Sequence, residues 1–106
     1  MVADQQVNPT YTADLAPVAL ELGESGLEGI VHVVAAGCAG WDEFARAVLA
    51  ELHVSAEVGP ASSAEFAGGA RRPLNGCLAS TLVPPLRPWR EGLQEWAARR
   101  IEASRA

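Results

Sequence analysis

The sequence contains no lysine, although it contains eight arginines, and aromatic residues make up only 6% of its 106 positions. A chain without lysine cannot provide a lysine for a Schiff base or for proton transfer. Because aromatic residues are scarce, the core has to consist mostly of alanine, valine and leucine. A single core of this kind in so short a chain is expected to be marginally stable.

Catalytic and metal-binding signatures are also missing. There is no glycine-rich dinucleotide fingerprint, Walker loop, GxSxG or HExxH motif. The two histidines, His32 and His53, have no partner at a recognisable spacing. Cys38 and Cys77 form neither a CxxC pair nor a metal-ligand spacing, and the simplest interpretation is two small buried residues. The sequence therefore predicts no catalytic residue and no metal ligand in this chain.

Long apolar runs and positive charge are missing as well. No run approaches the ~20 residues that cross a membrane, and the first residues lack the features of a signal peptide. The formal net charge is −5, which disfavours nonspecific binding to nucleic acid because phosphate groups require a basic surface. We therefore expect a protein of the reducing cytoplasm that binds neither membranes nor nucleic acid.

Helical and strand periodicities are present. Apolar residues at helical spacing predict a helix over 12–25, with Asp14 favoured over Thr12 as its N-cap and Gly26 at its end. A continuous β-branched run over 29–36 is typical of a buried strand.

Two further helices are predicted over 40–52 and 88–104, with Trp41 and Trp89 as core anchors. Residues 2–7 and 56–58 are weaker strand candidates, and 62–66 is a candidate for one helical turn. This order indicates an α/β fold with too few strands for a doubly wound sheet.

Two polar stretches are candidates for ligand binding. In "ARRPLNG", residues 70–76, two adjacent arginines on a glycine-rich loop can hold a phosphate by paired hydrogen bonds, and Asn75 can add another contact. In "DQQVNPT", residues 4–10, the neutral polar residues Gln5, Asn8 and Thr10 stand at a strand end before a helix, where ligands bind in α/β sheets. A solvated arginine pair and ordinary turn and capping chemistry remain open alternatives.

Four stretches together resemble the C-terminal part of dTDP-4-dehydrorhamnose reductases, members of the extended short-chain dehydrogenase/reductase superfamily. They are "VADQQVNPTYTADLA", "GIVHVVAAGCAGWDEFARAVL", "AEVGPASSAEFAGGARRPLNGCL" and "LRPWREGLQEW". The resemblance covers nearly the whole chain, so residues 1–106 are interpreted as one sugar-nucleotide-binding lobe. It implies a small α/β substrate-binding lobe without the Rossmann nucleotide-binding domain.

In that family NADPH reduces a dTDP-4-keto sugar during dTDP-L-rhamnose synthesis. The resemblance implies substrate contacts from Arg72, Asn75, Asn8, Thr10 and Gln5, with Arg72 on the diphosphate. The cofactor loop and the catalytic Tyr–Lys pair are absent, since Tyr11 is the only tyrosine. The chain is therefore expected to bind no NADPH alone, and to need a Rossmann-domain polypeptide for any catalysis. A non-catalytic binding or regulatory module, or a truncated inactive fragment, is the alternative.

Overall fold

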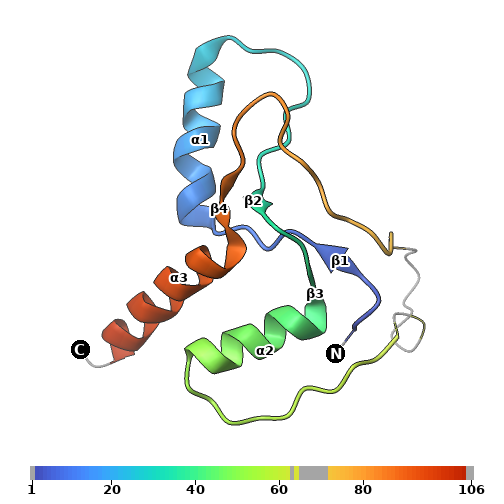
Figure 1. Cartoon of the computed structure of the whole chain (residues 1–106). Helices are drawn as coiled ribbons and strands as arrows, with labels where there is room; N and C mark the ends of the chain where they lie inside the picture. The colour runs from blue at the N-terminus through green and yellow to red at the C-terminus, as the bar shows by residue number, and fades with distance from the viewer. Residues whose placement is uncertain (1, 63, 65–71, 105–106) are drawn as a thin grey trace.

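The computed structural model describes residues 2–62, 64 and 72–104, and it confirms the α/β prediction. The described residues form three helices and four short strands, which Figure 1 shows. In chain order the elements are β1 (Gln6–Val7), α1 (Thr12–Ser25), β2 (Ala35–Ala36), β3 (Ala39–Gly40), α2 (Trp41–Glu51), β4 (Leu86–Pro88) and α3 (Trp89–Ser104).

The strands form two pairs. β1 runs antiparallel to β3, and β2 runs parallel to β4. An isolated bridge between Gln6 and Asn75 brings a second segment alongside β1, and another bridge joins Val2 to Ala61. Residues that are far apart in the sequence therefore meet at β1.

The strand predicted over 29–36 is mostly not formed. Only Ala35 and Ala36 are in a strand, and the side chain of Ile30 is 84% exposed. A strand is stabilised by its hydrogen-bonded neighbour, and β4 pairs only with the end of this run. Residues 56–58 are also irregular, and most of the predicted turn at 62–66 lies outside the described residues.

The start of α1 differs from the prediction. Tyr11 occupies the N-cap position without a side-chain hydrogen bond, so the assignment of Asp14 as N-cap was wrong. The Asp14 carboxylate instead accepts hydrogen bonds of 2.8 and 3.0 Å from Arg87 of β4, which also contacts Glu95 of α3 at 3.2 Å. The hydrogen bond with Asp14 raises the pKa of Arg87. At the other end, Gly26 terminates α1 as predicted, with a φ of 77°.

The core lies where α3 packs against α2 and the strands. Trp89, Leu93 and Ala97 of α3 are buried, as are Ala35 and Ala39. Phe44 of α2 meets Trp89 edge to face, with 5.8 Å between ring centroids. Trp89 is thus a core anchor, as predicted. The same prediction for Trp41 was wrong, because Trp41 is 38% exposed and meets Phe44 at the margin of this cluster.

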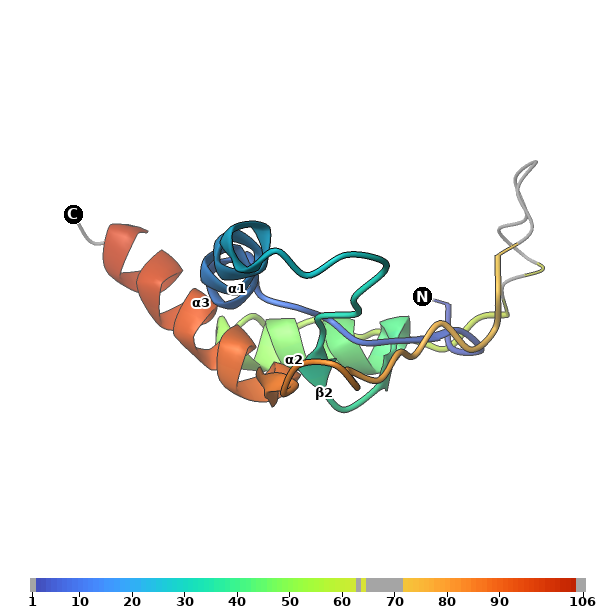
Figure 2. The ribbon, with the colours of Figure 1, turned by 90° about the horizontal axis from the view of Figure 1, so that it is seen from above.

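The molecule is flat, and it is thin when it is seen from above (Figure 2). Its principal extents are 46 × 42 × 22 Å, and its radius of gyration is 16.0 Å, against about 13 Å for a compact chain of this length. Its accessible surface is 7335 Å², where about 5,700 Å² is usual for this mass. Among the described residues, no helix is long and apolar enough to cross a membrane.

Candidate functional site

The polar stretch after β1 is fixed by the side chain of Asn8. Its Nδ2 donates to the carbonyl oxygens of Ala35 at 3.3 Å and Gly37 at 3.0 Å. Its Oδ1 accepts from the backbone N–H of Leu78 at 2.7 Å. One amide thus holds the β2 strand, the turn after β2 and the segment after Asn75 around the end of β1.

Thr10 extends the same framework. Its Oγ1 donates to the carbonyl oxygen of Asn8 at 3.0 Å and accepts from the backbone N–H of Ala35 at 3.2 Å. Both hydrogen-bonding roles of the hydroxyl are therefore used within the chain. Pro9 stands between these two residues and fixes φ there, which keeps the turn before α1 in one shape.

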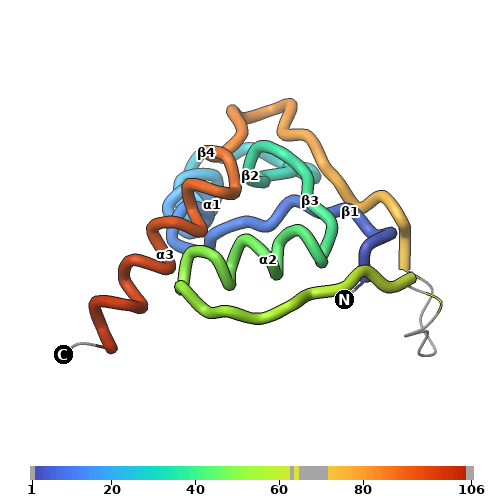
Figure 3. Tube along the Cα trace, turned by 60° about the horizontal axis from the view of Figure 1, so that its bottom comes forward, coloured from blue at the N-terminus to red at the C-terminus, as the bar shows by residue number. Residues whose placement is uncertain are grey.

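The arginine-bearing segment lies beside β1. The backbone N–H of Gln6 donates to Leu74 at 2.8 Å, and the backbone N–H of Gly76 donates to Gln6 at 2.7 Å. Figure 3 shows this segment passing close to β1. The two stretches that sequence analysis singled out separately are therefore neighbours, although about 65 to 70 residues separate them in the chain.

Arg72 and Asn75 are exposed on this segment, and Gln5 is half-buried on the facing stretch. The Asn75 Oδ1 accepts from the backbone N–H of Cys77 at 3.1 Å, which forms a tight turn. Arg71, the other half of the predicted fork, lies outside the described residues.

The five predicted substrate contacts thus fall into two groups. Arg72, Gln5 and Asn75 have atoms at the surface, whereas the side chains of Asn8 and Thr10 are engaged in the framework behind it. As ligand contacts, all five stay predictions. The sequence does not distinguish the two groups, because Asn8 and Asn75 both stand next to a proline or glycine in a predicted loop or turn.

The cysteines overturn one expectation. Cys38 and Cys77 are joined by a disulfide, with their Cα atoms 6.0 Å apart and a sequence separation of 39 positions. Cys38 is exposed and Cys77 is half-buried, so the interpretation as two small buried residues was wrong. The spacing of the two cysteines in the sequence does not predict the disulfide, because they meet through the pairing of the 72–78 segment with β1.

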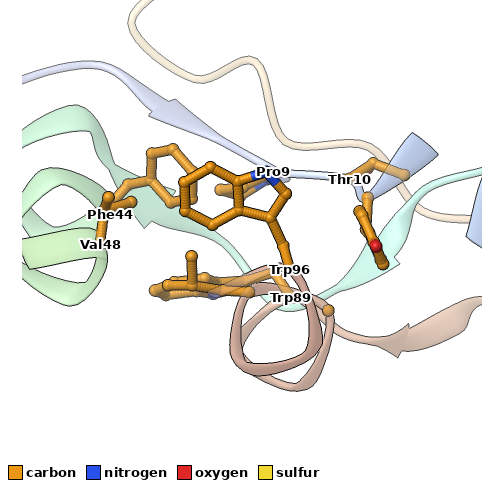
Figure 4. Close-up of a pocket in the computed structure, with 9 residues that line it drawn as sticks. Pro9, Thr10, Phe44, Val48, Trp89 and Trp96 are labelled. Carbon is orange, nitrogen blue, oxygen red and sulfur yellow. The ribbon is translucent and has the colours of Figure 1, made fainter. Parts of the chain in front are cut away.

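An apolar pocket of about 370 Å³ opens between the start of α1 and the helices α2 and α3. Phe44 and Val48 of α2 and Trp89 and Trp96 of α3 gather around it, with Pro9 at its side (Figure 4). The sequence predicts the helices that carry Phe44 and Trp89 but does not show that a hollow lies between them. Its lining offers little to a charged ligand.

In the described part of the chain, no three or more His, Cys, Asp or Glu side chains are grouped so that they could hold a metal ion. The acidic residues Asp42 and Glu43 lie in the first turn of α2, where Asp42 pairs with Arg46 at 2.8 Å.

The described part of the chain is a small α/β lobe in which two polar stretches lie side by side. The sequence pattern of the RmlD substrate binding domain matches residues 1–101, and the chain belongs to that family. The predicted resemblance and fold class are thereby confirmed.

Known relatives agree with this assignment. A dTDP-4-dehydrorhamnose reductase of Mycolicibacterium smegmatis is 37% identical over 98% of this chain and 34% of its own length. A probable dTDP-4,6-dihydroxy-2-methyloxan-3-one 4-ketoreductase of Streptomyces antibioticus is 37% identical over 90% of this chain and 35% of its own length.

Solved structures show the same lobe. The dTDP-4-dehydrorhamnose reductase of Bacillus anthracis, in complex with NADP, superposes with a TM-score of 0.86 at 31% identity. That match covers 92% of this chain and 37% of the reductase. The chain therefore spans about a third of the length of the proteins that it resembles.

Proposed function

We propose that this chain is the dTDP-sugar-binding lobe of an NADPH-dependent 4-keto-sugar reductase of the dTDP-4-dehydrorhamnose reductase type. One observation carries the proposal: the two polar stretches predicted to face the ligand are hydrogen-bonded side by side. The activities named for the relatives, which act on dTDP-sugars, support the choice of ligand.

In this proposal the residues divide their work. The exposed guanidinium of Arg72 binds the diphosphate, since arginine presents two parallel donors to phosphate oxygens. Gln5 and Asn75 supply neutral donors and acceptors beside it. Asn8 and Thr10 hold the strand end, so that the groups facing the ligand are positioned before it arrives.

The described residues do not fit NADPH. Dinucleotides bind where a glycine-rich turn leads into a helix N-terminus, and the turn from β1 to α1 contains no glycine and includes Pro9. At the start of α2, a Cβ atom placed on Gly40 would lie 2.8 Å from a carboxylate oxygen of Asp42. Its negative charge opposes a pyrophosphate there. We therefore assign the cofactor, and hydride transfer, to a Rossmann-domain polypeptide.

The first test is dTDP binding by calorimetry. We expect Arg72→Ala to weaken binding about tenfold, because a charged hydrogen bond contributes ~1.5–3 kcal/mol and the exposed position favours the lower end. Arg99→Ala is the matched control, since Arg99 is an exposed arginine of α3 paired only loosely with Glu95. Equal affinity of the Arg72 variant and the wild type would reject the assignment.

A second function, a non-catalytic module that binds another protein, is favoured by the apolar pocket and by the large open surface. The surface excess of roughly 1,700 Å² is comparable with the about 600–1,500 Å² that interdomain interfaces bury. Binding of dTDP favours the reductase lobe. A folded chain that ignores dTDP and captures a protein with no Rossmann domain favours the module, and a chain without cooperative unfolding favours an inactive fragment. Location in the cytoplasm stays a prediction.

A further inference from the structure

The disulfide sits at the centre of the candidate site. Cys38 follows Gly37, whose carbonyl accepts from Asn8, and Cys77 precedes Leu78, whose N–H donates to the same side chain. The Asn8 Nδ2 itself lies 4.0 Å from the Cys38 sulfur. The covalent link therefore joins the two segments that Asn8 also connects.

The 72–78 segment is also held by hydrogen bonds. Its backbone pairs with Gln6 on either side of the isolated bridge at Asn75, and the backbone of Leu78 bonds to the side chain of Asn8. A cross-link at Cys77 further restricts the segment that carries Arg72 and Asn75. When the link opens, the segment keeps its hydrogen bonds to Gln6 and Asn8 but loses its covalent attachment.

The position of the pair suits reversible chemistry. A Cα separation of 6.0 Å lies within the range that a disulfide spans. Cys38 is exposed and can meet a soluble thiol or disulfide. In the reducing cytoplasm predicted for this protein, disulfides are usually transient or redox-sensing rather than permanent.

We propose that Cys38 and Cys77 form a thiol–disulfide switch that orders the 72–78 segment and thereby sets the affinity for the sugar nucleotide. The effect on affinity rests on the proposed function, whereas the effect on segment order does not. The oxidised form is the ordered, tighter-binding form.

The oxidant is a low-molecular-weight disulfide such as glutathione disulfide. The Cys38 thiolate attacks one of its sulfurs and releases one glutathione thiolate. The Cys77 thiolate then attacks the Cys38 sulfur of the mixed disulfide and releases the second. The two cysteine sulfurs lose two electrons, and glutathione disulfide is reduced to two thiols that take up the two protons.

The test uses the full chain equilibrated in buffers with different ratios of glutathione to glutathione disulfide. Alkylation with mass spectrometry counts free thiols, hydrogen exchange follows the amides of Gly76 and Leu78, and calorimetry measures dTDP binding. On reduction we expect two free thiols, exchange about tenfold faster at both amides and dTDP affinity about tenfold weaker, a typical size for coupling between linked sites. Cys77→Ser should behave as the reduced form in every buffer.

The proposal would be overturned if Cys38 and Cys77 stayed as free thiols in a buffer rich in glutathione disulfide. It would also be overturned if reduction changed neither the amide hydrogen exchange nor the affinity for dTDP. If neither form binds dTDP but exchange still responds, the proposed function fails and the control of segment order stands. Wild-type protein supplies both redox states, so these readings do not depend on a variant that folds.

Discussion

At the scale of single residues, the amide of Asn8 defines the geometry of the candidate site. Its Nδ2 lies within 3.3 Å of the carbonyl oxygens of Ala35, Gly37 and Leu78, and its Oδ1 accepts from the backbone N–H of Leu78. An asparagine side chain has two donor hydrogens and one acceptor oxygen, so these contacts use each kind of group. This position therefore requires a side chain that both donates and accepts hydrogen bonds, as an asparagine does.

This requirement predicts the effect of Asn8→Asp. A carboxylate cannot donate, and it would face three carbonyl oxygens within 3.3 Å. We expect the free energy of unfolding to fall by about 1–3 kcal/mol, measured by urea denaturation at neutral pH.

Asn75→Asp is the matched control for that substitution. The Asn75 side chain accepts from Cys77 through its oxygen, and an aspartate keeps this contact. We expect almost no loss of stability. A similar loss in both variants would mean that charge, rather than the lost donor, destabilises the chain.

Residue identity alone could predict which side chains are polar and near a turn, but not their partners. Asp14 is a good N-cap by its place in the sequence, yet its carboxylate binds Arg87, which lies 73 residues further along the chain. The two cysteines give no clue for the same reason. Local rules describe neighbours in sequence, and these partners are neighbours only in the fold.

At the scale of elements, Gly92 shows how closely α3 approaches the start of α1. A side-chain carbon placed on Gly92 would lie 2.9 Å from the Cβ of Tyr11. In an isolated helix, alanine is preferred over glycine by about 0.5–1 kcal/mol. Here steric contact opposes that preference, and we expect contact to be the larger effect because both groups are attached directly to backbone.

We therefore expect Gly92→Ala to lower the free energy of unfolding by about 1–3 kcal/mol, as overpacking usually does. Gly23→Ala provides the matched control, because Gly23 lies in α1 with nothing within 4 Å of an added carbon. That variant should gain about 0.5–1 kcal/mol. Thermal unfolding of both, with opposite shifts of the midpoint, would confirm the close approach. Stabilisation by both would contradict it.

A helix could be predicted from the sequence where one of its faces packs against the core. The apolar spacing in 40–52 and 88–104 predicted α2 and α3, and Trp89, Leu93 and Ala97 are buried as that spacing requires. The prediction of a strand over 29–36 was mostly wrong, because a β-branched composition favours a strand but does not show whether a partner strand is present. Its exposed Ile30 is the clearest sign of a missing neighbour.

At the scale of the whole molecule, the chain is thin and exposes much apolar surface. Leu20, Leu27 and Ile30 are 50% exposed or more, and they belong to α1 and the segment after it. A second hollow, of about 450 Å³, lies between the same two parts of the chain. Apolar patches of this kind are typical of surfaces that another protein covers.

We therefore expect the isolated chain to self-associate as its concentration rises, which sedimentation velocity would detect. Ile30→Asp should shift association to higher concentration without changing the free energy of unfolding by more than about 0.5 kcal/mol, since the residue is 84% exposed. Glu28→Asp, an exposed change without apolar area, is the control. A wild-type chain that stays monomeric throughout would show that this surface does not drive association.

The hydrogen bond between Asn8 and Leu78 has a consequence for synthesis of the protein. The two residues are 70 positions apart, so at ~5–20 residues per second the ribosome needs roughly 4–14 s to make the second after the first. During that time the residues after β1 have been made, but the segment around Leu78 that bonds to Asn8 has not. A stop codon before Ala70 would leave the sequences of α1 and α2 intact and still yield a product that lacks the second polar stretch.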